Sequence, residues 1–328
     1  MERARGSRWS TFGRIFPGMN RLLVIALLGI GAAAWLGLGL PGGTSDPTAS
    51  TQAAPAIIME PEVTWTPAAP GEGRLFRIRV TASEHTPVMG VHGSVAGEEL
   101  HFERMSERSF ESLAGMPVGT EGAVTAQIRA VYRDGGEGHL EARVPVTPGS
   151  YAHEELRVAP RFGSPLSEAD QARLDNDRVL ARRASARAHR TPRLWGDFAI
   201  MPRDSRVTSG FGDGRIFNGQ VSSRHMGLDL RGNPGDTVVA AARGIVEVVA
   251  PFLLAGNVVY LNHGGGVVSG YFHLSRQLVV EGDTVDAGAP VGLVGATGRV
   301  TGPHLHWVVL YVNVSVDPRS LVELADGP

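Results

Sequence analysis

Hydrophobic residues follow three different patterns along this chain, and the first is an uninterrupted apolar run over residues 22–40. As a helix rising about 1.5 Å per residue, this run would be roughly 30 Å long, which matches the hydrocarbon core of a bilayer. Residues 1–21 contain several arginines and a single acid, Glu2, a bias typical of a cytoplasmic flank. The pattern therefore predicts a cytoplasmic basic segment over 1–21 and a single-pass membrane anchor, a transmembrane helix, over 22–40.

A cleaved signal peptide is the alternative interpretation of residues 22–40. The apolar core of such a peptide is usually about 7–15 residues long and is followed by a small-x-small cleavage site. Here the run is longer, and Pro41-Gly42-Gly43 is a poor cleavage context, so we favour an uncleaved anchor. Residues 41–56 are rich in Thr, Ser, Ala and Pro without an apolar period, which predicts an extracytoplasmic linker.

The second pattern is an alternation of apolar and polar residues between about 57 and 158. Residues 75–80 alternate apolar and basic side chains, as expected of a strand with one solvated face. Residues 124–132 and 139–146 read as two more strands around the turn Arg133-Asp134-Gly135-Gly136. Short strands at this spacing predict an immunoglobulin-like β-sandwich over 57–158. Its scattered histidines show no ligand spacing: His85, His92, His101 and His139.

The next segment, residues 159–195, is predicted to be a linker that contains one arginine-rich helix. Ser167 to Asp170 resembles a capping box with Asp in place of the usual Glu, and the residues up to about Ala188 include few helix breakers. Thr191-Pro192 ends the helix. Its arginines could attract an anionic polymer, but we favour a solvated helix with intrahelical Asp–Arg pairs.

The third pattern, short apolar strands between glycine-rich turns, begins near residue 194. Helical periodicity is absent from this part of the chain, which predicts a compact antiparallel β domain over 196–328 with a groove over one sheet. The fold class predicted for the whole chain is therefore mainly β. The strands expected in this domain are 237–242, 244–250, 257–261, 266–271, 290–294 and 305–311.

The composition of the chain argues against some classes of function and excludes some kinds of binding site. The 328 residues carry a formal net charge of −2, so no basic field argues for a nucleic-acid partner. The chain contains no cysteine, which excludes disulfides and thiolate ligands. Any metal site must therefore use His, Asp or Glu.

Four histidines and one aspartate in the C-terminal domain have the chemistry of a metal-dependent hydrolase. His225 and Asp229 are four residues apart, and Gly227 between them argues for a turn that leads into a strand. His304 and His306 are two apart, so on a strand both would line one groove, one reaching a metal and the other lying beside it. Three N and O ligands that leave one position open are typical of catalytic zinc, and a further histidine, His273, suits proton transfer.

These motifs give the domain a family resemblance over about residues 196–328. It resembles the lysostaphin/LytM-type zinc peptidases, the M23 class of peptidoglycan endopeptidases. The resemblance implies one Zn²⁺ per chain, held by His225, Asp229 and His306, with His273 and His304 as the catalytic histidines. His263 lies in an Asn-His-Gly turn outside the ligand pattern. The segments that carry the resemblance are 223–229, 271–274 and 297–307, supported by 211–215, 235–240 and 316–318.

The resemblance implies a zinc-dependent endopeptidase that hydrolyses peptide cross-links of bacterial peptidoglycan by attack of a metal-activated water. Two alternatives stay open: a non-catalytic, cell-wall-binding regulator of another hydrolase, and a zinc peptidase that acts on a protein substrate. The predicted anchor places the protein in the cell inner membrane, with most of the chain in the periplasm or extracytoplasmic space. The partners expected are peptidoglycan peptide stems, the cytoplasmic membrane and protein regulators.

Overall fold

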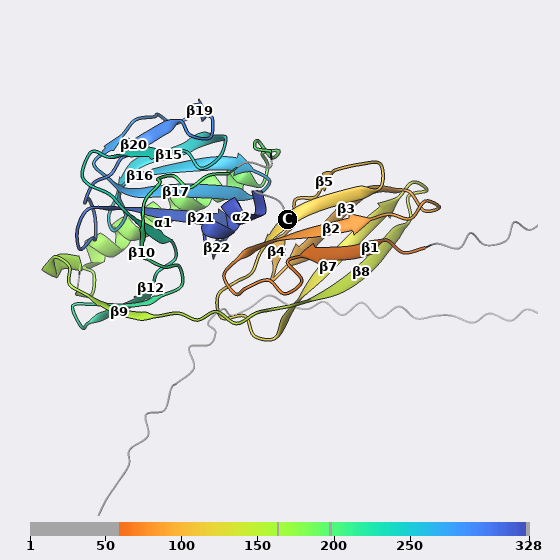
Figure 1. The fold of residues 1–328 in the computed structure, drawn as a ribbon, viewed down its shortest axis with the longest axis horizontal. Coiled ribbons are helices and arrows are strands. Elements are labelled where there is room, and N and C mark those ends of the chain that lie inside the picture. The colour runs from red at the N-terminus through yellow and green to blue at the C-terminus, as the bar shows by residue number, and fades with distance from the viewer. Residues whose placement is uncertain (1–58, 163, 197–198, 326–328) are drawn as a thin grey trace, which may run out of the picture. The chain divides into compact units, whose positions relative to one another are not determined.

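A computed structural model describes residues 59–162, 164–196 and 199–325, which are mainly β and include two α-helices (Figure 1). No helix in these ranges is both long enough and apolar enough to span a bilayer. The anchor predicted over 22–40 lies outside the described residues, as do the segments 1–21 and 41–56 on either side of it. These three segments remain predictions from the sequence.

Two antiparallel four-stranded sheets occupy the region predicted as a β-sandwich. Apolar side chains from both sheets, such as Ile78 and Ile128, belong to one buried core, because alternation turns every second residue of a strand inward. The predicted strands 75–80, 124–132 and 139–146 correspond to β2 (Leu75–Thr81), β7 (Ala123–Tyr132) and β8 (Glu137–Pro145). One sheet has the order β1 (Glu62–Thr66), β2 (Leu75–Thr81), β6 (Ser109–Gly115), β5 (Glu103–Arg104), and the other has the order β4 (Glu98–Glu99), β3 (Val88–Val95), β7 (Ala123–Tyr132), β8 (Glu137–Pro145).

The C-terminal domain is built on an eight-stranded antiparallel sheet. Its order is β10 (Val207–Ser209), β13 (Leu228–Arg231), β21 (His304–Tyr311), β17 (Val267–Leu274), β16 (Gly256–Gly264), β15 (Gly244–Phe252), β19 (Thr284–Val285), with β22 (Val314–Val316) beside β21. A smaller sheet contains β14 (Thr237–Val239), β20 (Pro290–Leu293) and β18 (Arg276–Gln277), and α2 (Arg319–Ala325) follows β22. All six predicted strands are present, although the one predicted over 237–242 already ends at Val239.

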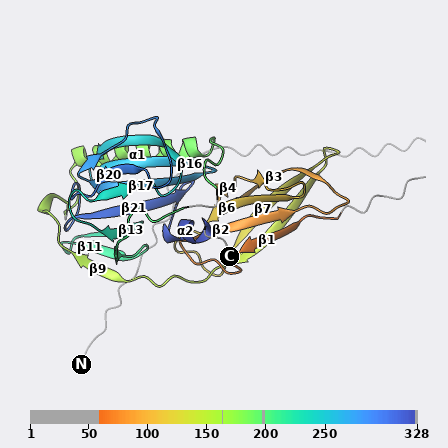
Figure 2. The same ribbon diagram turned by 45° about the horizontal axis from the view of Figure 1, so that its top comes forward.

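The two faces of the eight-stranded sheet carry different side chains. Phe272 and His306 lie opposite each other in the β17–β21 ladder and therefore share one face. Tyr271 and Trp307, each one residue along, lie on the other face. Helix α1 (Glu168–Ala188) covers part of the first face, where Ala184 and other small residues pack in one cluster with Phe272 (Figures 1 and 2).

Helix α1 has the predicted bounds but is more than a solvated linker. Ser167 caps it by accepting a hydrogen bond from the Asp170 N–H at 3.1 Å, and Arg178 pairs with Asp175 within the helix at 2.9 Å. Arg187, however, pairs with the buried Glu247 of β15 at 2.8 Å. The face that packs on the sheet consists mainly of alanines, so it leaves no strong apolar stripe in the sequence from which its burial could be predicted.

A short strand from before the predicted C-terminal domain joins that domain. β9 (His153–Leu156) lies parallel to β11 (Gly214–Phe217), and β11 pairs with β12 (Val221–Arg224) (Figure 2). The Asn218 side chain secures the end of this segment by bonding the backbone N–H and C=O of Val158 at 2.9 and 3.0 Å. Residues near 155 therefore contribute to the C-terminal domain rather than to the two sandwich sheets.

Candidate active site

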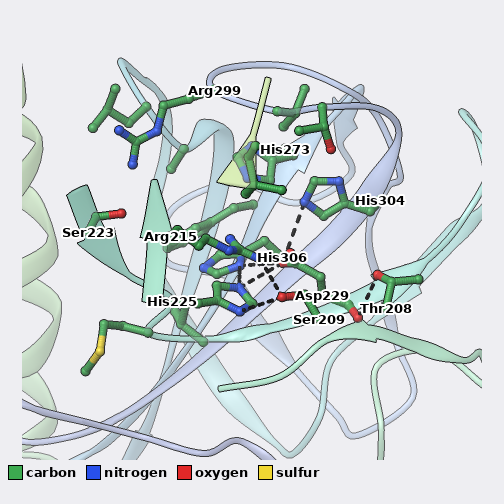
Figure 3. A pocket seen from close by; sticks show the side chains of 18 of the residues that line it. Thr208, Ser209, Arg215, Ser223, His225, Asp229, His273, Arg299, His304 and His306 are labelled. Carbon is green, nitrogen blue, oxygen red and sulfur yellow. Dashed lines mark hydrogen bonds and ion pairs between the residues drawn. The ribbon is translucent and has the colours of Figure 1, made fainter. Parts of the chain in front are cut away.

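The structure brings all five predicted site residues together around one pocket (Figure 3). His225 directly follows β12 and Asp229 lies in β13, so a turn does lead into a strand between them. Asp229 lies opposite His306 in the β13–β21 ladder. His304 and His306 both line the pocket, as expected for positions i and i+2 of one strand.

Three side-chain atoms converge at the centre of this site. The Nε2 atom of His225 is 3.0 Å from Oδ1 of Asp229 and 2.9 Å from Nδ1 of His306, and that Nδ1 is 2.7 Å from the same Oδ1. Among the described residues, this is the one group of His, Asp or Glu side chains with the spacing of a metal site. Three electron-pair donors that face one point are the arrangement a divalent cation requires.

A backbone carbonyl sets the tautomer of His225, and Gly227 allows the close approach of His306. Nδ1 of His225 faces the carbonyl oxygen of Gly210, so it carries the proton and leaves the Nε2 lone pair directed at the centre. Gly227 lies directly beside His306. A Cβ atom at Gly227 would be 2.6 Å from Cε1 of His306 and 2.7 Å from the carbonyl oxygen of Trp307, so only glycine fits there.

The two remaining histidines are anchored in the same way and present a free nitrogen. Nδ1 of His304 donates to the Gly302 carbonyl at 2.8 Å, and Nδ1 of His273 donates to the Thr297 carbonyl at 2.8 Å. Nε2 of each ring is therefore unprotonated in the neutral form. Nε2 of His304 lies 3.6 Å from Oδ1 of Asp229, directly beside the convergent atoms.

An unusual backbone conformation turns His273 toward the pocket. In a regular strand His273 would point to the face opposite Phe272, away from His306. Its φ of 61° is in the left-handed region, which non-glycine residues rarely adopt. The ring then lies with its centre 5.0 Å from that of His304 and 5.8 Å from that of His306.

Burial and neighbouring charges control the ionisation of the site. Burial lowers the pKa of His306 to about 4, although Asp229 opposes this shift. Burial also holds the pKa of His273 well below its usual range, and His306 and His304 add to the effect. For Asp229, burial alone would raise the pKa, but the close contacts with the His225 and His306 rings outweigh it and hold the pKa well below its usual value. Near neutral pH these groups are two neutral imidazoles beside a carboxylate.

Residues 223–318, which contain all five side chains, match the sequence model of Peptidase family M23. The C-terminal domain belongs to this family. The peptidoglycan DD-endopeptidase ShyC of Vibrio cholerae is 38% identical to the chain over 127 residues, which are 38% of this chain and 29% of ShyC. An uncharacterized metalloprotease of Haemophilus influenzae is 41% identical over 129 residues, 38% of this chain and 27% of that protein.

A crystal structure from Pseudomonas aeruginosa, assigned to the M23 peptidases, resembles more than the M23 domain. It is 25% identical with a TM-score of 0.58, and the match covers 75% of this chain and 92% of that one. This share is larger than the C-terminal domain alone could supply, so the likeness extends into the preceding residues. The chain spans less than a third of the length of the curated relatives named above, 29% of ShyC and 27% of the Haemophilus protein.

The pocket of the M23 domain has a volume of about 570 Å³ and is lined by several segments besides the five site residues. Leu156 of the β9 segment and Ala181 of α1 form parts of its wall. The guanidinium of Arg299 lies 4.0 Å from the centre of the Phe217 ring. Burial lowers the pKa of Arg299, and the positive charge of Arg215 adds to this shift. Within the described part of the chain, no carboxylate pairs with Arg299.

Several polar residues at this pocket were not predicted from the sequence, among them Glu154, Arg215 and Arg299. Arg215 and Arg299 lie inside segments that carry the family resemblance, so the sequence placed them near the site. It did not indicate which groups their side chains contact. Glu154 had no local signal, because it reaches the site only through the pairing of β9 with β11.

Proposed function

We propose that this protein is a zinc-dependent endopeptidase that hydrolyses peptide cross-links of bacterial peptidoglycan. The observation that carries the proposal is the convergence of three donor atoms, from His225, Asp229 and His306, beside two histidines that each keep one free nitrogen. The naming of ShyC as a peptidoglycan DD-endopeptidase supports the choice of substrate. Since the chain matches 29% of ShyC, the activity of the whole protein is our inference and not a property transferred from that relative.

The donor set suits zinc. Zinc in catalytic sites takes three His or carboxylate ligands at about 2.0–2.2 Å, which places neighbouring donor atoms of a tetrahedral site ~3.3 Å apart. The three distances here, 2.7, 2.9 and 3.0 Å, are shorter than that by about 0.3 to 0.6 Å. A zinc ion at this point would polarise the scissile carbonyl and lower the pKa of water to about 7.

His304 and His273 are the residues we assign to proton transfer. Each holds its Nδ1 proton on a backbone carbonyl and offers an unprotonated Nε2 at the pocket. Such a nitrogen can accept the proton that the attacking water loses and return it to the leaving amine. The lowered pKa of His273 keeps this ring neutral near pH 7, so it is ready to act as an acceptor or as a hydrogen-bond partner for the reacting peptide.

The charge of the pocket fits an anionic peptide. Arg215 is paired with two acids, but Arg224, Arg231 and Arg299 also line the pocket, and Arg299 has no acid partner among the described residues. The peptide stems that we propose as substrate would fit this charge where they carry free carboxylates. Arginine binds carboxylates through paired N–H donors, so these residues would favour such stems over neutral peptides.

We also propose that the M23 domain works outside the cytoplasm. This part of the proposal rests on the sequence of residues 1–40, in which a basic segment precedes an apolar run. A single-pass anchor over 22–40 would hold the domain in the periplasm, close to the cell wall. Protease accessibility of the C-terminal domain in whole cells and in spheroplasts would test this placement.

Digestion of purified sacculi tests the proposed reaction. The full chain would be incubated with zinc or with a chelator, and the released muropeptides analysed by mass spectrometry. We expect each cross-linked dimer to be replaced by two monomers whose combined mass exceeds that of the dimer by one water, in the zinc sample alone. Intact sacculi together with stoichiometric zinc binding would overturn the proposal and favour a regulator that binds the wall, or a peptidase with a protein substrate that a protein screen would reveal.

A further inference from the structure

Strand β9 brings an acidic residue to the site from outside the segment that matches the M23 family. Glu154 lies opposite Arg215 in the parallel pairing of β9 with β11. Its carboxylate accepts a hydrogen bond from Nε of Arg215 at 3.1 Å, and both of its oxygens lie 3.1 Å from the Ser209 hydroxyl. The side chain of Glu154 on β9 therefore holds two polar groups of the M23 domain.

Both of these groups touch residues that we assign to the metal. Nη2 of Arg215 donates to Oδ2 of Asp229 at 2.6 Å and to the Ser209 hydroxyl at 2.7 Å. The Ser209 oxygen in turn lies 3.4 Å from Nδ1 of His225. The side chain of Arg215 is only 13% exposed, so little solvent is available to replace a lost partner.

The two oxygens of Asp229 are consequently in different surroundings. Oδ1 faces the two histidine nitrogens at the centre, and Oδ2 is held by Arg215. A guanidinium free to rotate could bind both oxygens of a carboxylate as a fork. Because Glu154 holds the Nε edge of Arg215, only Nη2 reaches Asp229, and Oδ1 stays available to a cation.

We propose that Glu154 is a positioning residue of the metal site, which acts through Arg215 and Ser209 to orient Asp229 and His225. The inference rests on the metal site proposed above but not on the identity of the substrate. It makes β9 part of the working M23 domain, although this strand lies outside residues 223–318. Groups that hydrogen-bond to metal ligands typically change metal affinity by about 10–100-fold when they are removed.

The test compares Glu154→Gln with Glu155→Gln in the full chain. Glu155 is the next residue of β9 and its side chain is exposed, so its substitution is a matched control for charge and for strand stability. Zinc affinity would be measured by competition with a chromophoric chelator, and the visible spectrum of the cobalt-loaded protein would report the ligand geometry. We expect Glu154→Gln to weaken zinc binding by about 10-fold or more and to change the cobalt spectrum, with Glu155→Gln like the wild type.

Each outcome decides the proposal. Wild-type zinc affinity and an unchanged cobalt spectrum in Glu154→Gln would overturn it, even if sacculi are cut. If Glu154→Gln fails to fold, Ser209→Ala replaces it; this variant removes only the hydroxyl between Glu154, Arg215 and His225, and unchanged zinc affinity in it would also overturn the proposal. A wild-type chain that binds no zinc would refute the metal site itself, whereas zinc binding without cleavage would refute only the proposed substrate.

Discussion

The histidines that line the pocket differ from His263, on the opposite face of the eight-stranded sheet, in how their ring nitrogens are used. On one face, His225, His273 and His304 each place one nitrogen on a backbone carbonyl and direct the other toward the pocket. On the other face, both nitrogens of His263 are bonded, to the Arg243 carbonyl at 2.8 Å and to the Ser269 hydroxyl at 2.7 Å. His263 is fully buried.

The difference separates a histidine that can react from one that stabilises the fold. The Ser269 oxygen also lies 2.9 Å from the Tyr271 hydroxyl, which accepts from the Ala241 N–H at 2.8 Å. This network is closed, since every polar atom named in it has a partner within the protein. A histidine in the M23 domain is therefore a candidate for chemistry when one nitrogen is anchored and the other is open to the pocket.

The strongest test of this comparison removes a proposed metal ligand from one face and a histidine from the other. We expect His306→Ala to abolish stoichiometric zinc binding and cleavage, because one of the three donor atoms is lost. The loss of zinc affinity should exceed the roughly 10–100-fold effect of removing a group that only hydrogen-bonds to a metal ligand. His263→Ala should keep one zinc per folded chain. Equal zinc content in the two variants, measured by elemental analysis, would break the comparison.

The next largest effect should separate chemistry from metal binding on the pocket face. His304→Ala is expected to lower kcat by about 10²–10⁴-fold, the usual contribution of a general acid or base. Its zinc affinity should stay within a few-fold of the wild type, because Nε2 of His304 is near Oδ1 of Asp229 but outside the convergent set. Parallel measurement of kcat and zinc affinity checks this; a variant that loses zinc and activity together would assign His304 to the metal instead.

Because His263 lies in this closed network, the free energy of unfolding should depend on pH. Burial lowers the pKa of His263 from its ordinary value of 6.5 to about 4. The unfolded chain therefore takes up a proton below pH 6.5, while the folded chain resists it down to about pH 4. This contribution to stability is complete above pH 6.5 and declines as the pH falls toward 4, by about 3 kcal/mol in total.

A non-titrating variant isolates this contribution from the histidines of the active site. The free energy of unfolding would be measured by urea denaturation for the wild type and for His263→Gln between about pH 7 and pH 4. We expect the difference between the two proteins to change by most of those ~3 kcal/mol across this window. A difference that stays constant with pH would mean that His263 is not held neutral by burial.

The smallest expected effect is that of Ser269→Ala. This change removes the hydroxyl that bonds His263 and Tyr271 and leaves two buried groups short of a partner. We expect a loss of about 1–3 kcal/mol in the free energy of unfolding, with zinc binding and kcat unchanged. Thermal melts together with a zinc titration check both parts, and altered zinc affinity would show that the two faces of the sheet are coupled.

Features encoded by local pattern were predictable from the sequence. Alternation places His304 and His306 on one face of β21, and Gly227 indicates the turn before Asp229. Short apolar strands between glycine-rich turns predicted the antiparallel domain, and the Ser167 cap predicted the start of α1. In each case the information lies within a few neighbouring residues, where backbone sterics and strand periodicity act.

Features that depend on distant pairing or on unusual backbone were not predictable in this way. Glu154 reaches Arg215 across 61 positions of sequence, through a strand of four residues without a distinctive pattern. Alternation alone would have placed His273 on the wrong face, because its left-handed conformation is set by the surrounding fold. Its assignment came from family resemblance, and the structure supplies a physical reason for it.

Anomalous X-ray diffraction from crystals of the zinc-loaded chain would test the central claim most directly. We expect one zinc ion about 2.0–2.2 Å from Nε2 of His225, Oδ1 of Asp229 and Nδ1 of His306, with an open position that faces His304 and His273. A zinc ion bound elsewhere, or one whose fourth position is closed by a protein side chain, would contradict the account.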